Sequence, residues 1–192
     1  MILYLLGLVL FLGVHLVPTF PGLRADLRLR FGEMPYKGLF ALLSVIGIVL
    51  IVIGFGEVRA SSWNRELWSP PVWTKHIAFL LMLFSFVALV ASQVPSRIRT
   101  ALKHPMLVGV KLWALAHLIA NGDLASLILF GSFLAWAVYD RISVKKRGAL
   151  GPLGGARGGL KGDIIVVAVS LVLYVVMLKW GHAWLIGVRL IG

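Results

Sequence analysis

Apolar residues gather into about six long runs along this chain of 192 residues. The runs cover roughly residues 2–19, 38–56, 73–94, 105–120, 123–139 and 163–179. A helix needs about 20 residues to cross the ~30 Å of hydrocarbon in a bilayer. Polar residues, prolines and glycines separate the runs. The pattern therefore predicts an all-α fold, a polytopic transmembrane helical bundle with about six spanning helices.

Prolines and glycines mark several ends of these runs. Pro95 ends the third run, and Pro105 stands where a first-turn proline belongs in the fourth. Between the fourth and fifth runs, Gly122 can adopt a positive φ and Asp123 can cap the next helix. Both of these runs are short, and we expect them to form a tight, deeply embedded helical hairpin.

The composition agrees with a membrane protein. Hydrophobic residues make up 60% of the chain and charged residues 14%, whereas a soluble domain carries about half and about a quarter. There is no cysteine, which excludes disulfides, thiolate ligands and cysteine nucleophiles. No basic segment precedes the first run, so it is predicted to be a retained helix. We expect one integral membrane domain over residues 1–192, with a flexible, glycine-rich basic linker in 140–162.

The net charge of +12 reflects topology rather than nucleic-acid binding. Of the 19 Lys and Arg residues, 13 lie in the connections 20–37, 95–104 and 140–162. The positive-inside rule places these connections in the cytoplasm and both termini on the periplasmic side of a bacterial inner membrane. Five tryptophans fall on the opposite side, as an interfacial belt would: Trp63, Trp68, Trp73, Trp180 and Trp184. Membrane lipid is the partner that this charge predicts.

The histidines carry the candidate chemistry. In this topology His76 and His117 form an outer layer with His182 near the outer interface, and His15 and His104 form an inner layer. An intramembrane imidazole serves as an interhelical hydrogen-bonding group, a proton relay or a metal ligand. Two histidines at matched depth on different helices suit bis-histidine haem. Depth therefore favours His76 as the partner of His117.

Three further side chains lie near these histidines on the fourth run. Trp113 and Met106 share the helical face of His117, where they suit the rim of a porphyrin or ordinary packing. Lys111 lies about 120° from His117 and on the face of His104. It either snorkels to the inner interface or supplies a counter-charge for a carboxylate or phosphate. Trp113, Met106, Lys111 and His104 are the candidate cofactor contacts.

Several segments carry a resemblance to a known family. KHPMLVGVKLWALAHLIANG at 103–122, VHLVP near the N-terminus, LILFG in the fifth run and YDRISVKKR after it resemble the NnrU family of bacterial inner-membrane proteins. The likeness covers essentially the whole chain. That family is named for an association with nitrite and nitric oxide reduction, and is similar to the 15-cis-zeta-carotene isomerase of plants and cyanobacteria.

The resemblance implies a cofactor and a substrate class. The isomerase depends on haem b held by histidine, and its proposed ligands correspond to His15 and His117. Lys103 replaces an arginine of the pattern, which keeps the charge but loses bidentate geometry. The resemblance implies a haem-b protein associated with denitrification or with redox-type isomerisation of a lipophilic, carotenoid-like substrate, with a redox partner not identified. The ligand pair stays open between His15–His117 and His76–His117.

Two other functions remain as alternatives. One is a non-catalytic accessory or transport protein of nitrite and nitric oxide metabolism. The other is an isoprenylcysteine-type methyltransferase, because such enzymes share the basic-His-Pro-x-x-x-Gly pattern found at 103–109. Their later carboxylate motifs are missing, since Asp163 is the only acid after Arg147. The sequence also shows no catalytic triad and no nucleotide-binding loop.

Overall fold

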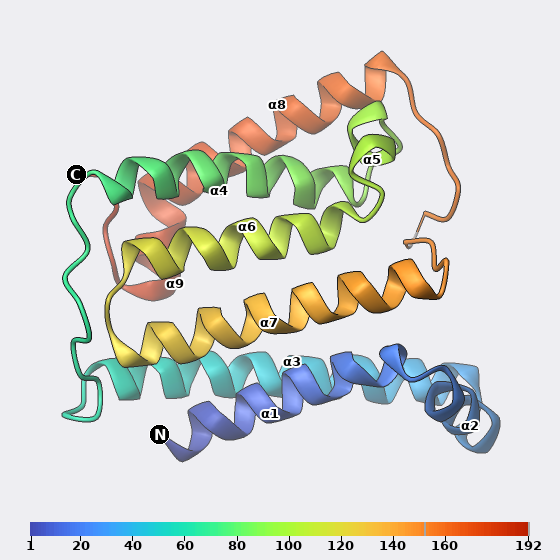
Figure 1. Cartoon of the computed structure of the whole chain (residues 1–192), viewed down its shortest axis with the longest axis horizontal. Helices are drawn as coiled ribbons and strands as arrows, with labels where there is room; N and C mark the ends of the chain where they lie inside the picture. Colours follow the sequence, from blue (N-terminus) through green and yellow to red (C-terminus); the bar gives the residue numbers. More distant parts are fainter. Residues whose placement is uncertain (152, 192) are drawn as a thin grey trace. The chain divides into compact units, whose positions relative to one another are not determined.

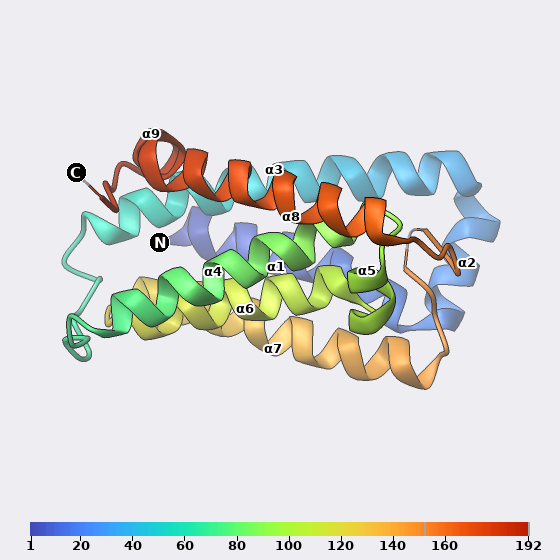
Figure 2. The ribbon, with the colours of Figure 1, turned by 90° about the horizontal axis from the view of Figure 1, so that it is seen from above.

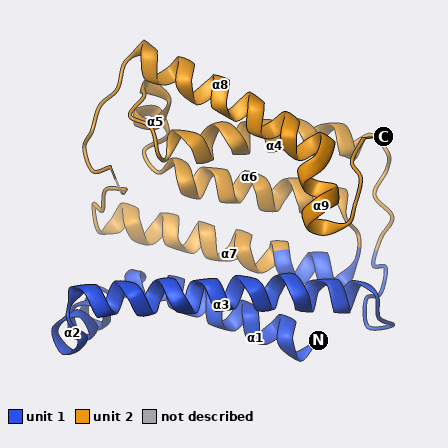
Figure 3. Cartoon of the chain, turned by 180° about the vertical axis from the view of Figure 1, so that it is seen from behind, with its two compact units in different colours: residues 1–67, 123–129 blue, residues 68–122, 130–192 orange. Residues whose placement is uncertain are grey.

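The computed structural model describes residues 1–151 and 153–191, which form two compact units (Figure 3). The first unit contains Met1–Leu67 and Asp123–Leu129, and the second contains Trp68–Gly122 and Phe130–Gly192. Apart from one isolated bridge between Glu66 and Asp123, the regular secondary structure of the described residues is helical. The predicted all-α fold is confirmed.

The first unit is built on two helices that pack closely. They are α1, Ile2–Leu16, and α3, Glu33–Arg59, which lie side by side (Figure 1). Glycines on α3 permit the close approach, since a Cβ at Gly54 would overlap the backbone of Tyr4 and one at Gly47 would lie 2.9 Å from the Cβ of Phe11. Small residues are the usual means by which membrane helices approach one another.

Shorter helices complete the first unit. A 3₁₀ turn, Val17–Thr19, leads to α2, Pro21–Phe31, in the connection that we expected to be a loop. The initial turns of α7, Leu124–Lys146, also belong to this unit.

The second unit is centred on α4, Thr74–Ala91, which packs against α6, Pro105–Ala120, and α8, Leu160–Val176 (Figure 2). Hydrogen bonds cross both contacts. The Ser85 hydroxyl donates to the Gly109 carbonyl at 2.8 Å, and the Tyr174 hydroxyl donates to the Phe79 carbonyl at 3.0 Å.

Further helices continue and connect these three. The short helix α5, Arg97–Leu102, precedes α6. A π-helix, Met177–Gly181, and then α9, His182–Ile186, continue α8.

The six predicted spanning segments are all present as helices, with corrections to their ends. Among the described residues, five helical stretches are long and apolar enough to cross a membrane, and α6 is a shorter apolar helix. We expected the fifth segment to be short and to end at 139, but α7 continues to Lys146. Its charged last turns contain no glycine or proline, and the chain first turns at Gly148, where φ is +59°.

The turn between α6 and α7 confirms one prediction and corrects another. Asp123 caps α7, because the Ser126 N–H donates to Asp123 Oδ1 at 3.0 Å and the Ser126 hydroxyl donates to Oδ2 at 2.7 Å. The positive φ that we expected for Gly122 is wrong, since it is not among the described glycines with positive φ. Glycine is required for another reason: a Cβ there would overlap the carbonyl oxygen of Trp68.

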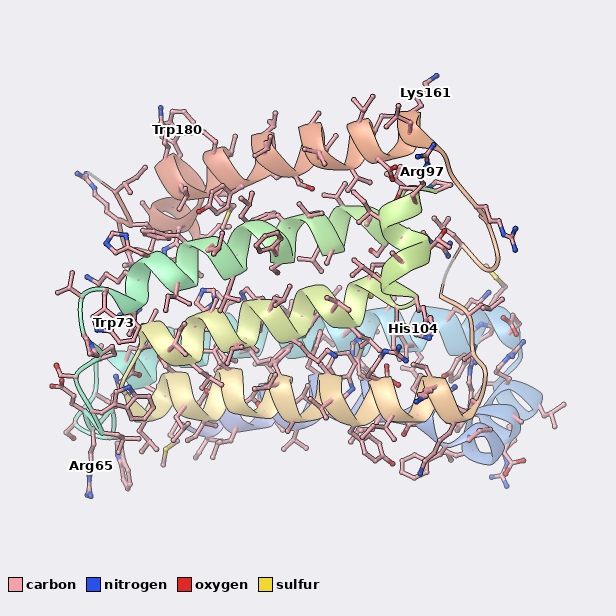
Figure 4. All side chains as sticks on the ribbon, turned by 45° about the horizontal axis from the view of Figure 1, so that its top comes forward. Arg65, Trp73, Arg97, His104, Lys161 and Trp180 are labelled. Carbon is pink, nitrogen blue, oxygen red and sulfur yellow. The ribbon has the colours of Figure 1, made fainter. Side chains whose placement is uncertain are left out.

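The two ends of the second unit differ in chemistry. Arg97, His104 and Lys161 lie at one end of its helices, and Trp73 and Trp180 lie at the opposite end (Figure 4). A basic cytoplasmic end and an aromatic outer end are what the positive-inside rule and the interfacial belt predict.

Candidate functional site

His117 lies in the penultimate turn of α6 and is half-buried. Its Nδ1 is 2.8 Å from the carbonyl oxygen of Trp113, one turn earlier. A carbonyl oxygen only accepts, so Nδ1 carries the proton, and in the neutral ring Nε2 keeps its lone pair. The local helix therefore fixes both the tautomer and the direction of the remaining nitrogen.

Aromatic rings surround His117. The Phe130 ring stacks on it with centroids 4.5 Å apart and an interplanar angle of 22°, and the Trp113 ring lies 5.4 Å away. Trp113 in turn meets Phe130 and Phe133 edge-on, at 4.9 and 5.4 Å. These rings hold the imidazole in place and make its surroundings apolar. Trp113, a predicted cofactor contact, lies beside His117 as expected.

His182 is the histidine that the structure brings to His117. The ring centroids are 6.5 Å apart and the ring planes differ by 15°. The Nδ1 of His182 lies 2.8 Å from the carbonyl oxygen of Val188, so this ring is also oriented by a backbone carbonyl. Our sequence analysis placed His182 near the outer interface but did not pair it, because it lies beyond the predicted end of the sixth segment.

The other two candidate metal ligands are placed differently. The side chain of His76, on α4, is exposed, and within the described residues it makes no ring contact with His117. His15 belongs to the first unit, where its Nδ1 lies 2.7 Å from the Phe11 carbonyl and its ring stacks on Phe11 at 4.2 Å. Ligation of a metal by His76 or His15 stays a prediction.

His104 stands between α5 and α6 and is half-buried. Burial lowers the pKa of His104 below its usual range, and Arg141 adds to this, while Asp140 opposes it. The preceding residue, Lys103, has φ of +62°, a conformation that is strained for a side chain other than glycine. The basic-His-Pro segment thus forms a sharp turn that presents a neutral imidazole.

The remaining predicted cofactor contacts show no direct contact with His117. Lys111 is half-buried on α6. Met106 is 41% exposed and does not join the rings around His117. Roles for Lys111, Met106 and His104 in cofactor binding stay predictions.

Comparison with known proteins agrees with the sequence motifs. The family model described as NnrU protein matches residues 3–190. The chain belongs to the NnrU family. No curated protein and no solved structure gives a match. This NnrU protein is therefore a multi-pass membrane protein of that family.

One feature of this NnrU protein escaped our sequence analysis. Arg99, on α5, is only 8% exposed, and its guanidinium donates to the carbonyls of Ala156 at 2.8 Å and Gly154 at 2.9 Å. Asp163, at the start of α8, accepts from the Ile98 N–H at 3.1 Å. The stretch that we expected to be a flexible linker is thus held against α5 at these points. Pro152, in the same stretch, lies outside the described residues.

Proposed function

We propose that this NnrU protein binds haem b in the membrane, with His117 as an axial ligand. Its activity is then associated with nitrite and nitric oxide metabolism or with redox-type isomerisation of a lipophilic, carotenoid-like substrate. The observation that carries the proposal is the imidazole of His117, half-buried among aromatic rings, with its Nδ1 committed to the Trp113 carbonyl.

The residues around His117 fit a haem. Metal-ligating histidines usually donate the other ring N–H to a carbonyl or carboxylate, and His117 does so. Among the described residues there is no group of three or more His, Asp or Glu positioned to hold a metal ion. A porphyrin supplies four nitrogens of its own, so one or two histidines complete the coordination. The stacked Phe130 covers a face of the ring, whereas ligation uses its edge.

Each of these residues has a defined part in the proposed site. His117 presents Nε2, and its hydrogen bond to the Trp113 carbonyl raises the basicity of that nitrogen. The rings of Trp113 and Phe130 restrict rotation of the imidazole and exclude water from it. Haem, when bound, supplies one-electron chemistry at its iron. An apolar site in the membrane gives a lipophilic substrate direct access from the lipid.

Optical spectroscopy tests this proposal. Purified protein should show a Soret band, with sharp α and β bands in the reduced-minus-oxidised spectrum. His117→Ala should lower bound haem by about tenfold or more, because the ligand that orients the iron is lost. His76→Ala is the matched control, since that side chain is exposed and distant from the rings around His117.

The outcome separates the two classes of function. Parent protein that never binds haem, or His117→Ala that binds it as the parent does, would contradict the proposal. His117 would then be a structural hydrogen-bonding group, and a non-catalytic accessory or transport role would be favoured. Retention of haem by His104→Ala is also expected, because His104 lies at the basic end of the second unit.

A further inference from the structure

We propose that His182 is the second axial ligand of the haem at His117. The inference rests on the proposed function and adds to it a residue that no sequence motif identified. Both histidines belong to the second unit, and their rings face one another across 6.5 Å with planes 15° apart.

The separation of the two rings matches shared coordination. With metal–nitrogen bonds of about 2 Å, two imidazoles on opposite sides of one iron hold their ring centroids roughly 6 Å apart. The rings of His117 and His182 are 6.5 Å apart, too far for direct stacking contact. Nearly parallel planes allow both rings to point an edge at the same ion.

The two rings are also oriented in the same manner. Each places Nδ1 2.8 Å from a backbone carbonyl, Trp113 for His117 and Val188 for His182. The same tautomer therefore holds at both residues, and each presents Nε2 as the nitrogen with a lone pair. Two imidazoles preset in this way need no proton transfer and little reorientation to bind iron.

The chain reaches this arrangement through irregular backbone around His182. The π-helix Met177–Gly181 directly precedes it, and π-helical turns occur frequently at functional sites. An inserted residue rotates everything that follows by about 100° relative to a regular α-helix. Gly181 is needed there, since a Cβ would lie 2.5 Å from the Sδ of Met177.

A second irregularity follows α9. Gly187 has φ of +76°, the left-handed conformation that glycine favours after a helix. This turn brings the carbonyl of Val188 back to the ring of His182. The segment from Met177 to Val188 thus sets both the direction and the tautomer of His182.

The direct test is the spin state of the bound haem. Parent protein should give a six-coordinate low-spin spectrum, and His182→Ala should convert it to high-spin because one axial ligand is removed. His182→Met should restore six-coordination with a higher midpoint potential, since Met/His ligation raises the potential of haem. His76→Ala and His15→Ala should leave the low-spin spectrum unchanged.

A second variant tests the positioning of His182 rather than its chemistry. Gly187→Val should disfavour the left-handed turn and move the Val188 carbonyl away from Nδ1. Loss of such a hydrogen bond costs about 10–100-fold in metal affinity. Haem transfer to an excess of apomyoglobin should therefore be faster by a similar factor. Size-exclusion chromatography and thermal unfolding would confirm that the variant is folded.

The results distinguish this inference from the proposed function. A parent protein without haem refutes the proposed function, and the assignment of His182 with it. Haem that is five-coordinate in the parent, or low-spin in both the parent and His182→Ala, overturns the His182 assignment alone. Conversion to high-spin by His15→Ala or His76→Ala instead would assign the second ligand to that residue. If His182→Ala does not fold, the coordination and potential of His182→Met decide.

Discussion

Polar side chains on the helices repeatedly bond to backbone carbonyls. His15 and His117 each bond the carbonyl four residues earlier, and Ser85 and Tyr174 donate to carbonyls of a neighbouring helix. An unsatisfied polar group in hydrocarbon costs several kcal/mol, so such bonds are expected for any role. For a histidine, the position of the second nitrogen is therefore more informative than the presence of the ring.

Gly122 gives a prediction at the residue scale. Gly122→Ala should lower the free energy of unfolding by about 1–3 kcal/mol, because the added Cβ overlaps the Trp68 carbonyl. Gly131→Ala is the matched control: a Cβ there meets nothing within 4 Å, and alanine favours a helix interior over glycine. Thermal unfolding in detergent would measure both. Equal stability of Gly122→Ala and the parent would show that the turn moves away from Trp68 without cost.

The same turn shows what a sequence can predict at this scale. The cap by Asp123 depends on residues within one helical turn, and it was predicted correctly. The reason for Gly122 depends on Trp68, which is distant in the sequence, and the assumed positive φ was wrong. For the same reason the sequence did not pair His117 with His182, because a π-helix and a left-handed turn place the second ring.

At the scale of elements, the connections contain more structure than their polarity suggested. Both α2 and α5 lie in segments that are rich in Arg and therefore looked like loops. Hydropathy identifies helices that face lipid, but it gives little signal for short helices with charged residues. The apolar runs, by contrast, predicted every spanning helix, since length and hydrophobicity are properties of the run itself.

Arg99 gives a prediction at this scale. Arg99→Ala removes both donors to the carbonyls of Gly154 and Ala156, and should lower the free energy of unfolding by about 1–3 kcal/mol. It should also expose the glycine-rich stretch to protease. Arg97→Ala is the control, because its side chain is 69% exposed and its pair with Asp163 spans 3.9 Å, so about 0–1 kcal/mol is expected. Similar proteolysis of the two variants would show that Arg99 does not hold the stretch.

At the scale of the whole molecule, topology links charge to the candidate site. The second unit carries its labelled basic residues at one end and its tryptophans at the other (Figure 4). Six crossings return the chain to the side on which it began, and 13 of 19 basic residues lie on the opposite side. The shortest apolar helix, α6, has 16 residues and spans about 24 Å, so it crosses only where the bilayer is locally thin.

Reporter fusions test this topology. Fusions after residues 30, 100 and 150 should report cytoplasm, and fusions after 65 and 192 should report periplasm, because the basic connections stay inside. A fusion after residue 122 should also report periplasm if α6 crosses. A cytoplasmic signal at 122 together with a cytoplasmic C-terminus would mean that α6 enters the membrane and returns on the same side. The haem proposed at His117 would then lie toward the cytoplasmic face, and its electron partner would be sought there.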